Sequence, residues 1–522
     1  MDNILAYINL AAFVLLLVAK LRFELHMMQQ NSYRNERYFR WIKINFITKL
    51  RISEALVLLL ITLAYFLKLA QYVFFATPLL YILIAINYLH KKQKLKLVFT
   101  KRAQRLFYSM LTVLLVGTLV SWMAIKTPSG IFITLTLMVV LSPLVVLVIN
   151  QLMIPIENNI NEWFVNDARR IVATMPNLII IGITGSYGKT STKHFLHRIL
   201  SEKYNVLMTP GSFNTTMGVV RTIREHLNAT HQIFIVEMGA KQPGDIKEIC
   251  DLVKPRYGIL TAVGEQHLET FKTIENVRNT KFELINALPP EGIAILNSDY
   301  EWIAKTSVTH TKTIYYGLEN PTAANKATGI SYDTNGATFS INNGTTMYTT
   351  PLLGDYNISN ILACILLAEQ LGLENQAITY GVKKLVPVEH RLEIKRNPDG
   401  ITIIDDAFNS NPKGAEMAMK VLSNFNTGKR IVVTPGIIEL AAKHAYYNSE
   451  LGKQIAQSAD YAILVGKKQT EPIYNGLKSA GFPDEKIYIA SDLNDALRHM
   501  NSFAGKGDTV LFENDLPDLF LN

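Results

Sequence analysis

Residues 178–192 read LIIIGITGSYGKTST, and this stretch indicates the fold class more clearly than any other. Its apolar start is typical of a buried parallel strand, which breaks into a glycine-rich turn before Lys189 and three hydroxyl residues open a helix. Glycines let backbone N–H groups approach phosphate oxygens, while the helix N-terminus and Lys189 supply positive charge. The pattern therefore predicts a nucleotide phosphate loop in which Thr190 ligates Mg²⁺. We expect the nucleotide to contact Gly185, Ser186, Tyr187, Gly188, Lys189, Thr190 and Ser191.

The chain has 522 residues, which is room for roughly three or four domains that each bury a core. Its two cysteines, Cys250 and Cys364, are too few for a disulfide framework and have no metal-ligand spacing, as expected in a reducing compartment. The net charge of +9 would suit nucleic acid, but many of the basic residues lie between apolar runs in the N-terminal third. We therefore expect membrane lipids as partners and no nucleic acid.

The apolar residues, 49% of the chain, are most concentrated in residues 1–155. Their runs are long enough to cross a bilayer of roughly 30 Å. The first run lacks the basic flank and the cleavage site of a signal peptide, so we expect it to be retained. The expected membrane domain has about five transmembrane helices, two of them in the second of these blocks: 4–21, 52–89, 106–124 and 131–154.

The loops between the apolar runs differ in basic residues. Residues 22–51 and 91–105 each hold seven lysines and arginines, whereas the other two loops hold only Lys68 and Lys126. Because basic loops stay in the cytoplasm, five spans put the N-terminus outside and the chain after residue 154 inside. The sequence thus predicts a multi-pass protein of the cytoplasmic membrane whose catalytic domains lie in the cytoplasm, where ATP is available.

Beyond the membrane domain, apolar strands alternate with helices. We expect an amphipathic linker helix at 156–177 and an α/β domain at 178–385, whose parallel sheet is covered on both faces. Short alternating runs in 312–351 predict antiparallel strands attached to that sheet. The alternation starts again near residue 386 and predicts a second, smaller α/β domain at 386–522.

Seven motifs in this part of the chain carry a family resemblance. They are TGSYGKTST (184–192), GSFNTTMGVVRT (211–222), IFIVEMGAKQPGDI (233–246), VGEQHLETFKTIENVRNTKFEL (263–284), LLGDYNISNILA (352–363), VEHRLE (388–393) and IIDDAFNSNPKG (403–414). In this order they resemble the Mur ligase family, which joins amino acids to peptidoglycan precursors in bacterial cell wall biogenesis. GSYGKT, EMGA, GEQHLE and DDAFNSNP are together most similar to its D-alanyl-D-alanine-adding branch.

The resemblance implies a P-loop Mur ligase central domain, a Rossmann-like C-terminal domain, and ATP and two Mg²⁺ ions as cofactors. It implies that the catalytic residues are Lys189, Glu237, His267, Lys281 and Arg391. The implied metal ligands are Thr190, Glu237, His267 and Lys281, the last of them as a carbamate. Beyond the phosphate loop, the implied nucleotide contacts are Asn357, Asn360, Arg391, Asp406 and Asn409.

The residues themselves support these roles unequally. Glu237 ends an apolar strand at the sheet edge where open α/β folds bind ligands, which favours a magnesium role over a solvated carboxylate. His267 alone is more often a structural histidine, but Glu265 and Glu269 on either side of it, just beyond an apolar strand, favour a metal ligand. Lys281 alone would be a surface lysine, and Arg391 and Asp406 alone would be ordinary surface charges. The roles of these last three residues therefore depend on the resemblance.

The implied reaction has two steps. A substrate carboxylate attacks the γ-phosphate of ATP to give an acyl phosphate, and the amine of an amino acid or dipeptide then displaces phosphate to form an amide. Bringing two anions together requires the cations that the motifs supply.

The chain departs from the family at three places. Usual members begin with a soluble domain for the UDP part of their substrate, and here apolar runs stand instead. We therefore expect a lipid-linked or membrane-associated carboxylate acceptor, with a simple tether as the alternative. Tyr356 replaces the usual histidine, and LFENDLPDLF at 511–520 replaces a basic, glycine-containing segment, which leaves the amine open.

Two other functions fit parts of the sequence. A membrane-bound poly-amino-acid ligase that makes capsule would share the ATP loop and the apolar N-terminus. An ATP-driven transporter or sensor would also combine a P-loop with membrane spans, but the sequence has no second nucleotide loop.

Overall fold

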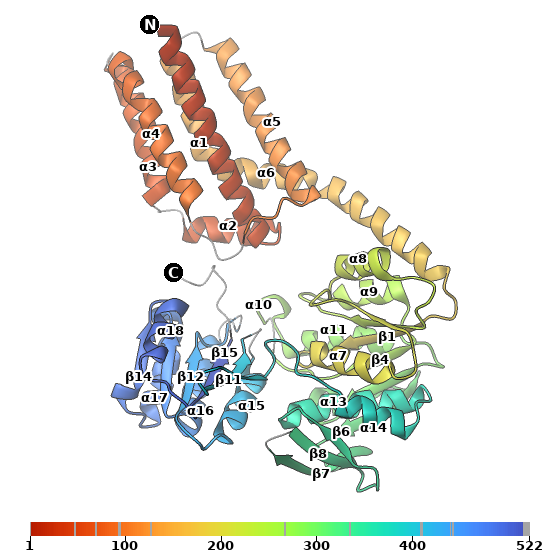
Figure 1. Cartoon of the computed structure of the whole chain (residues 1–522). Helices are drawn as coiled ribbons and strands as arrows, with labels where there is room; N and C mark the ends of the chain where they lie inside the picture. The colour runs from red at the N-terminus through yellow and green to blue at the C-terminus, as the bar shows by residue number, and fades with distance from the viewer. Residues whose placement is uncertain are drawn as a thin grey trace. The chain divides into compact units, whose positions relative to one another are not determined.

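The computed structural model describes residues 2–45, 49–67, 70–91, 96–125, 128–265, 268–333, 336–407, 411–438, 440 and 443–514 (Figure 1). The chain divides into two compact units, Met1–Glu162 and Trp163–Asn522.

The N-terminal unit is helical, as the sequence predicts. Five of its helices have 18 or more residues and cover the five predicted spans, and a short helix, α2, follows the first. Among the described residues only two helices, Lys101–Ser121 and Ile133–Ala173, are long and apolar enough to cross a membrane, which is fewer than the five spans that the sequence predicts. Ile52–Ala64 and Phe75–His90 are shorter apolar helices. The helices are α1 (Asp2–Gln30), α2 (Asn35–Ile44), α3 (Lys49–Phe66), α4 (Ala70–His90), α5 (Lys101–Ala124) and α6 (Pro128–Ala173).

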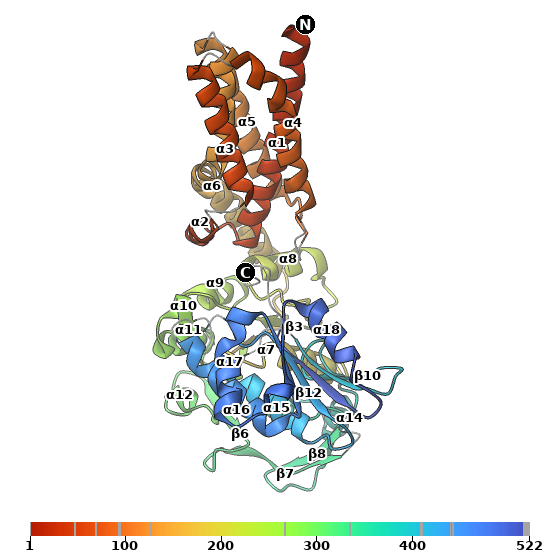
Figure 2. The same ribbon diagram turned by 90° about the vertical axis from the view of Figure 1, so that its left-hand side faces the viewer.

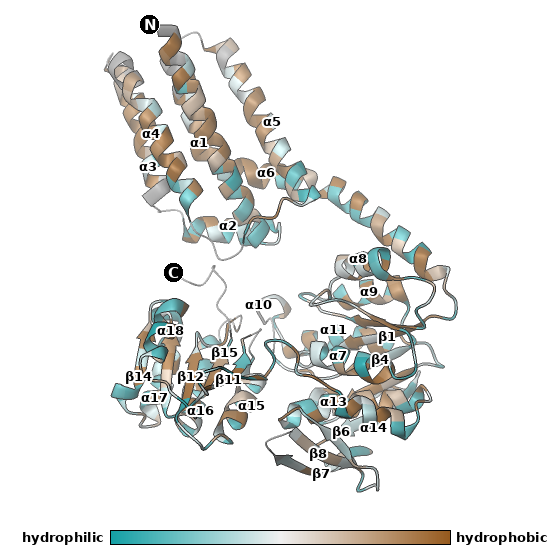
Figure 3. Ribbon diagram, in the orientation of Figure 1, coloured by the Kyte–Doolittle hydropathy of each residue, from teal (hydrophilic) through white to brown (hydrophobic). Residues whose placement is uncertain are grey.

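Apolar side chains lie on the outside of this unit as well as in its core. Leu59, Leu79, Leu119 and Leu152 are 61, 62, 55 and 70% exposed. Apolar residues occur along most of the length of the long helices (Figure 3). Soluble monomers rarely expose large contiguous apolar patches, and such patches mark surfaces that associate with another protein or with a membrane.

The last predicted span and the predicted linker form one continuous helix, α6, of 46 residues. The change from apolar to charged sequence occurs near Glu157, whose carboxylate accepts two hydrogen bonds from the Arg105 guanidinium at 2.7 and 2.6 Å. Bidentate pairs of this kind are the strong form of ion pair. The pair joins α5 to α6 where the sequence changes character.

The second unit begins with a nine-stranded sheet in the order β2-β3-β1-β4-β5-β6-β7-β8-β9. The strands are β1 (Ile179–Thr184), β2 (Val206–Met208), β3 (Ile233–Glu237), β4 (Tyr257–Leu260), β5 (Ile293–Asn297), β6 (Lys312–Gly317), β7 (Asn325–Asp333), β8 (Gly336–Ile341) and β9 (Tyr348–Thr350). The prediction of antiparallel strands in 312–351 is right for β7, β8 and β9 but wrong for β6, which runs parallel to both neighbours. The composition of a strand does not encode its direction. The direction of β6 is set by the connection from β5, which is only a short helix and a loop.

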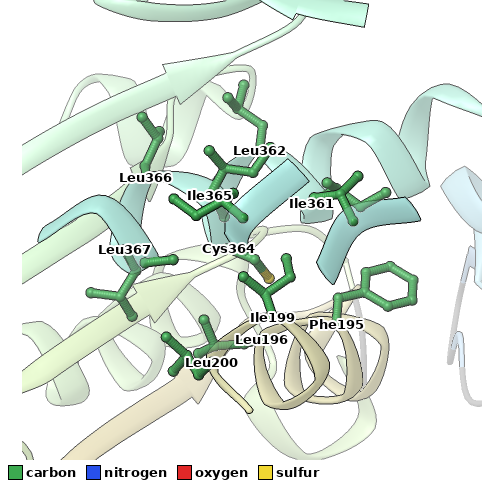
Figure 4. Packing of buried hydrophobic residues seen from close by; sticks show 14 of the residues in the cluster. Phe195, Leu196, Ile199, Leu200, Ile361, Leu362, Cys364, Ile365, Leu366 and Leu367 are labelled. Carbon is green, nitrogen blue, oxygen red and sulfur yellow. The ribbon is translucent and has the colours of Figure 1, made fainter. Parts of the chain in front are cut away.

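Helices cover both faces of this sheet, as predicted. On one face, α7 and α13 pack together through Phe195, Leu196 and Ile199 of α7 and through Ile361, Cys364 and Ile365 of α13 (Figure 4). The other face is covered by α8, α9, α11 and the end of α6. The helices are α7 (Lys189–Leu200), α8 (Thr216–His226), α9 (Asp245–Val253), α10 (Leu268–Phe271), α11 (Ile274–Asn286), α12 (Glu301–Ala304), α13 (Asp355–Gln370) and α14 (Asn375–Lys383).

A six-stranded sheet follows in the order β10-β11-β15-β12-β13-β14, parallel except for β10. Its strands are β10 (Glu393–Arg396), β11 (Thr402–Asp406), β12 (Arg430–Thr434), β13 (Tyr461–Val465), β14 (Ile487–Ala490) and β15 (Thr509–Glu513). Helices α15 (Pro412–Ser423), α16 (His444–Ser458) and α17 (Lys467–Ser479) cover one face, and α18 (Leu493–Asn501) covers the other (Figure 2). The predicted second α/β domain is confirmed.

Candidate active site

The predicted phosphate loop joins β1 to α7. Gly188 precedes the helix with φ of 81°, a conformation that favours glycine. A Cβ at Gly188 would lie 2.6 Å from Asn360 Oδ1, so a side chain there would displace a neighbouring element. Both constraints explain why the loop needs glycine at this position.

The strand β4 and the residues after it hold this loop in place. The Ser186 hydroxyl donates to the Gly264 carbonyl at 2.9 Å, and the Tyr187 hydroxyl donates to the Glu265 carbonyl at 3.1 Å. The Thr261 hydroxyl donates to the Tyr187 carbonyl. The Ser186 backbone N–H also donates to the Ala262 carbonyl at 2.8 Å. Ser186 therefore fixes the loop through both its side chain and its main chain, and Tyr187 fixes it through its side chain.

Lys189 lies over the loop that it follows. Its ammonium group donates to the carbonyls of Gly185 at 2.7 Å and Ser186 at 3.3 Å. Burial lowers the pKa of Lys189 to about 8, with Glu237 opposing that change and Arg391 adding to it. The group is still charged at neutral pH, as phosphate binding requires.

Glu237 and Thr190, both predicted as metal ligands, are in contact. Glu237 ends β3 with 1% of its surface exposed, and its Oε1 accepts from Thr190 Oγ1 and Asn214 Nδ2, each at 3.1 Å. Its Oε2 lies 3.0 Å from Lys193 Nζ. Burial alone would raise the pKa of Glu237, but the ammonium groups of Lys193 and Lys189 lower it below its ordinary value. Glu237 is thus held as a carboxylate.

Lys281 is buried in α11 with 2% of its surface exposed, unlike the surface lysine that its position alone suggested. Burial, reinforced by repulsion from Lys189, brings the pKa of Lys281 well below its ordinary value. Glu237 also acts on this group through its charge. Lys189, Glu237 and Lys281 therefore lie within electrostatic reach of one another.

The oxygen atoms of Thr190 and Glu237 suit magnesium, which prefers oxygen ligands and keeps several waters. Among the described residues no three His, Cys, Asp or Glu side chains are arranged to hold a metal ion. The predicted ligand His267 lies outside the described residues, as does Asn409. The oxygen pair and the buried cations fit a magnesium–nucleotide complex.

The two asparagines at the start of α13 differ in their contacts. Asn357 donates to the Leu353 carbonyl at 2.9 Å, within its own helix start. Asn360 faces Gly188, and its buried Nδ2 has no hydrogen-bond partner among the described residues. A buried donor without a partner is costly, and one beside a phosphate loop indicates a ligand contact. The geometry supports Asn360 more than Asn357.

Arg391 and Asp406 are neighbours at the start of the C-terminal α/β domain. Burial raises the pKa of Asp406 to about 6, against the Arg391 charge and the Leu392 N–H, which donates to Asp406 Oδ1 at 3.1 Å. The charge of Arg391 also acts on Lys189. The structure thus brings Arg391 near both the phosphate loop and the C-terminal domain.

Sequence reasoning missed two groups of the site. Lys193 and Asn214 both contact Glu237. Lys193 follows Lys189 by four residues on the same helix face, a spacing that was visible in the sequence. Glu265 was also missed as a link between domains: it accepts from the Tyr447 hydroxyl at 2.6 Å and pairs with Lys443.

Comparisons with known proteins agree with this fold and site. Residues 183–368 match the Mur ligase middle domain, and residues 390–513 match the Mur ligase glutamate ligase domain. UDP-N-acetylmuramoyl-tripeptide–D-alanyl-D-alanine ligase from Bacillus subtilis (strain 168) is 28% identical over 336 residues, which cover 64% of this chain and 72% of that protein. The Escherichia coli (strain K12) protein of the same name is 31% identical over 296 residues, covering 55% of this chain and 65% of its own length.

Solved structures show the same fold. The MurF ligase from Thermotoga maritima in complex with ADP aligns with a TM-score of 0.61 at 24% identity, covering 69% of this chain and 81% of that one. A MurF structure from Acinetobacter baumannii aligns with a TM-score of 0.61 over 68% and 77% of the two chains. Neither family match reaches the N-terminal unit, because the first begins at residue 183.

A glycine-rich loop that runs into a lysine-bearing helix, on a largely parallel sheet that is followed by a separate α/β domain, is typical of a protein that binds a nucleotide. The chain belongs to the Mur ligase family, whose ATP-dependent members join an acid to an amino acid. The interpretation as a transporter or sensor is therefore set aside.

Proposed function

We propose that this protein is a membrane-bound Mur ligase that joins a carboxylate to an amine through an acyl phosphate in the synthesis of bacterial peptidoglycan precursors. Its acceptor is lipid-linked or membrane-associated. The observation that carries the ligase activity is the cluster at the phosphate loop, where the part-buried Lys189 and the buried Lys193 act on a single carboxylate, Glu237. Two ammonium groups beside one carboxylate leave positive charge for an anion, and ATP and the substrate carboxylate are both anions.

The residues act by binding and charge. Lys189 and the loop N–H groups hold the phosphates. The γ-phosphoryl group breaks its bond to ADP and bonds to the carboxylate oxygen, and Arg391 neutralises the charge on that group during the transfer. The amine nitrogen then attacks the acyl carbon, phosphate leaves, and the nitrogen loses its proton to solvent. Among the described residues no side chain serves as a nucleophile, because the substrates supply both nucleophiles.

We assign the metal ligands as Thr190, Glu237, His267 and a carbamylated Lys281, which would hold two Mg²⁺ ions. Magnesium supplies positive charge to the transferred phosphoryl group. The support is the Thr190–Glu237 contact of 3.1 Å and the depressed pKa of Lys281, since a neutral amine is the form that adds CO₂.

We assign the remaining nucleotide contacts to the adenosine side: Asn357, Asn360, Asp406 and Asn409. Asn360 has the strongest support, because its buried amide lies against Gly188 without a hydrogen-bond partner among the described residues. The C-terminal domain would bring Asp406 to the ribose.

We further propose that residues 1–155 form a five-span membrane domain with its N-terminus outside, followed by the linker at 156–177 and the domains at 178–385 and 386–522. The support is the five long helices, their exposed leucines and the two basic loops. The B. subtilis relative is named for a UDP-linked acceptor and D-alanyl-D-alanine. A polytopic unit in this chain would instead let a lipid-linked acceptor reach the cytoplasmic site.

The test supplies the full-length protein in nanodiscs with ATP, Mg²⁺ and D-alanyl-D-alanine, and with either a UDP-linked or a polyprenyl-linked peptide. We expect amine-dependent phosphate release with both, and at least about tenfold higher kcat/KM for the polyprenyl-linked form. Equal turnover of both would remove the role of the membrane unit in recognition. Phosphate release without any amine would contradict the ligase activity.

A poly-amino-acid ligase is the second candidate, because it would combine the same phosphate loop with the same apolar N-terminal helices. The amine panel therefore includes glutamate and other amino acids, and repeated addition to one acceptor would favour this candidate.

A further inference from the structure

Lys193 is a buried lysine that none of the proposed steps uses. It lies in α7, one turn after Lys189, and its side chain has no exposed surface. Its ammonium group lies 3.0 Å from Glu237 Oε2 and donates to the Gly211 carbonyl, in the loop that follows β2. Lys193 thus joins the phosphate-loop helix to the end of β3 and to a third segment.

We propose that Lys193 is a positioning residue, the built-in counter-ion that pairs with Oε2 of Glu237 and keeps Oε1 aimed at Thr190 until magnesium binds. This inference rests on the proposed role of Glu237 as a magnesium ligand. Because the ammonium group is fully buried, it contacts the carboxylate and not a substrate. Lys193 therefore acts through Glu237.

The division of contacts on Glu237 supports this role. Oε1 faces the Thr190 hydroxyl and the Asn214 amide, both at 3.1 Å, whereas Oε2 faces Lys193. The Glu237 backbone N–H donates to Thr209 Oγ1 at 3.1 Å, which fixes the residue's main chain. One oxygen is thus held by a permanent cation, and the other is directed at the loop where a metal–nucleotide complex would lie.

The alternative is that Lys193 only stabilises the fold. A buried ion pair is weak evidence for stability in itself, because removing both charges together is often harmless, whereas removing one leaves an uncompensated charge. A second substitution at Glu237 therefore tests whether the two groups act as a pair, and the effect of added magnesium separates the two possibilities.

The experiment compares melting temperatures of the full-length protein in detergent as wild type, Lys193→Met, Glu237→Gln and the double variant. We expect Lys193→Met to lower Tm by roughly 5 °C or more and the double variant to regain most of that loss. Lys193→Arg keeps the charge and should stay near wild type. Lys305→Met is the matched control, because its Lys–Glu pair with Glu301 is on the surface and should change Tm little.

Magnesium chloride without nucleotide is the second arm. If magnesium can replace the missing ammonium group, it should raise Tm more in Lys193→Met than in the wild type, and it should not do so in either Glu237→Gln protein. A double variant no more stable than Lys193→Met, or a failure of both to fold, would overturn the counter-ion role. An equal magnesium shift in Lys193→Met and wild type would overturn the link to the metal. The double variant could regain stability while magnesium still raises the Tm of Glu237→Gln as much as that of the wild type. That result would support the counter-ion role but would remove Glu237 from the proposed metal site.

Discussion

Both units of this protein bury lysines beside glutamates, but in opposite proportions. In the N-terminal unit, one ammonium group, Lys20, lies 3.2 Å from Glu24 and 3.0 Å from Glu54, and the Tyr88 hydroxyl accepts from it at 2.8 Å. At the phosphate loop, the ammonium groups of Lys189 and Lys193 act on one carboxylate, Glu237, and a third lysine, Lys281, is buried nearby with a pKa well below its ordinary value. The first cluster has enough negative charge within the helical bundle, whereas the second lacks it. We call the Lys20, Glu24 and Glu54 cluster the interhelical clamp. The excess of cations distinguishes a site for an anionic ligand from this clamp.

The largest expected effect tests the cationic side of this comparison. Lys189→Met removes the charge nearest the phosphate loop and should lower kcat/KM for ATP about 10³-fold, since preorganised charge at a phosphoryl group is worth that much. Amine-dependent phosphate release measures it. Lys305→Met should leave the rate unchanged, and an unaltered Tm of Lys189→Met would show that the fold is intact. A loss below tenfold would mean that the loop does not hold the phosphates.

The second prediction tests the clamp. Lys20→Met leaves Glu24 and Glu54 buried together, which should destabilise the N-terminal unit by about 3 kcal/mol. Thermal unfolding in nanodiscs, followed by loss of helical circular dichroism, measures this change. Nucleotide affinity should stay within about twofold of wild type if the cluster is purely structural.

Lys43→Met is the matched control for the clamp, because Lys43 is exposed on α2. A Lys20→Met protein as stable as this control would contradict the clamp. Loss of nucleotide affinity in Lys20→Met would show instead that the two clusters are coupled.

Much of the fold was predictable because its signals are local. The apolar run before the phosphate loop became β1, and the predicted alternation of apolar strands and helices became the first sheet and the helices that cover it. The direction of β6 was not predictable, because a strand's direction depends on which neighbour it pairs with and not on its own residues. The continuous helix α6 was missed because the change from apolar to charged sequence resembles a boundary.

The candidate site also has residues that could be predicted from sequence and residues that could not. The phosphate loop and Glu237 follow from sequence, because glycine spacing and the end of an apolar strand are local features. The burial of Lys281 is not local: it depends on how α11 packs on the sheet, and in the sequence it is one lysine in an ordinary helix. The spacing of Lys193 from Lys189 was visible in the sequence, but its burial against Glu237 depends in the same way on how α7 packs on the sheet.

The third prediction uses the effect of burial on a cation. Because burial lowers the pKa of Lys189 to about 8, its ammonium group is charged at pH 7 and loses its proton as the pH rises through that value. Affinity for a nucleotide should therefore be about tenfold weaker at pH 9 than at pH 7, measured by equilibrium binding to the free enzyme. Lys189→Arg keeps its charge over this range and should bind without this pH dependence. A flat profile in the wild type would show that another group holds the phosphates.

The smallest expected effect compares two asparagines three residues apart. Asn360 has a buried amide nitrogen without a partner among the described residues, so it gains a hydrogen bond only when a ligand arrives. Asn357 already donates to Leu353 within its helix start. Asn360→Ala should therefore weaken nucleotide binding by roughly fivefold to tenfold with little loss of Tm, because a hydrogen bond is worth about 1 kcal/mol. Asn357→Ala should lower Tm by a few degrees at nearly unchanged affinity. Weaker nucleotide binding in Asn357→Ala, together with a lower Tm in Asn360→Ala, would contradict this assignment. The buried amide of Asn360 would then be a packing defect, and the nucleotide would contact α13 through Asn357.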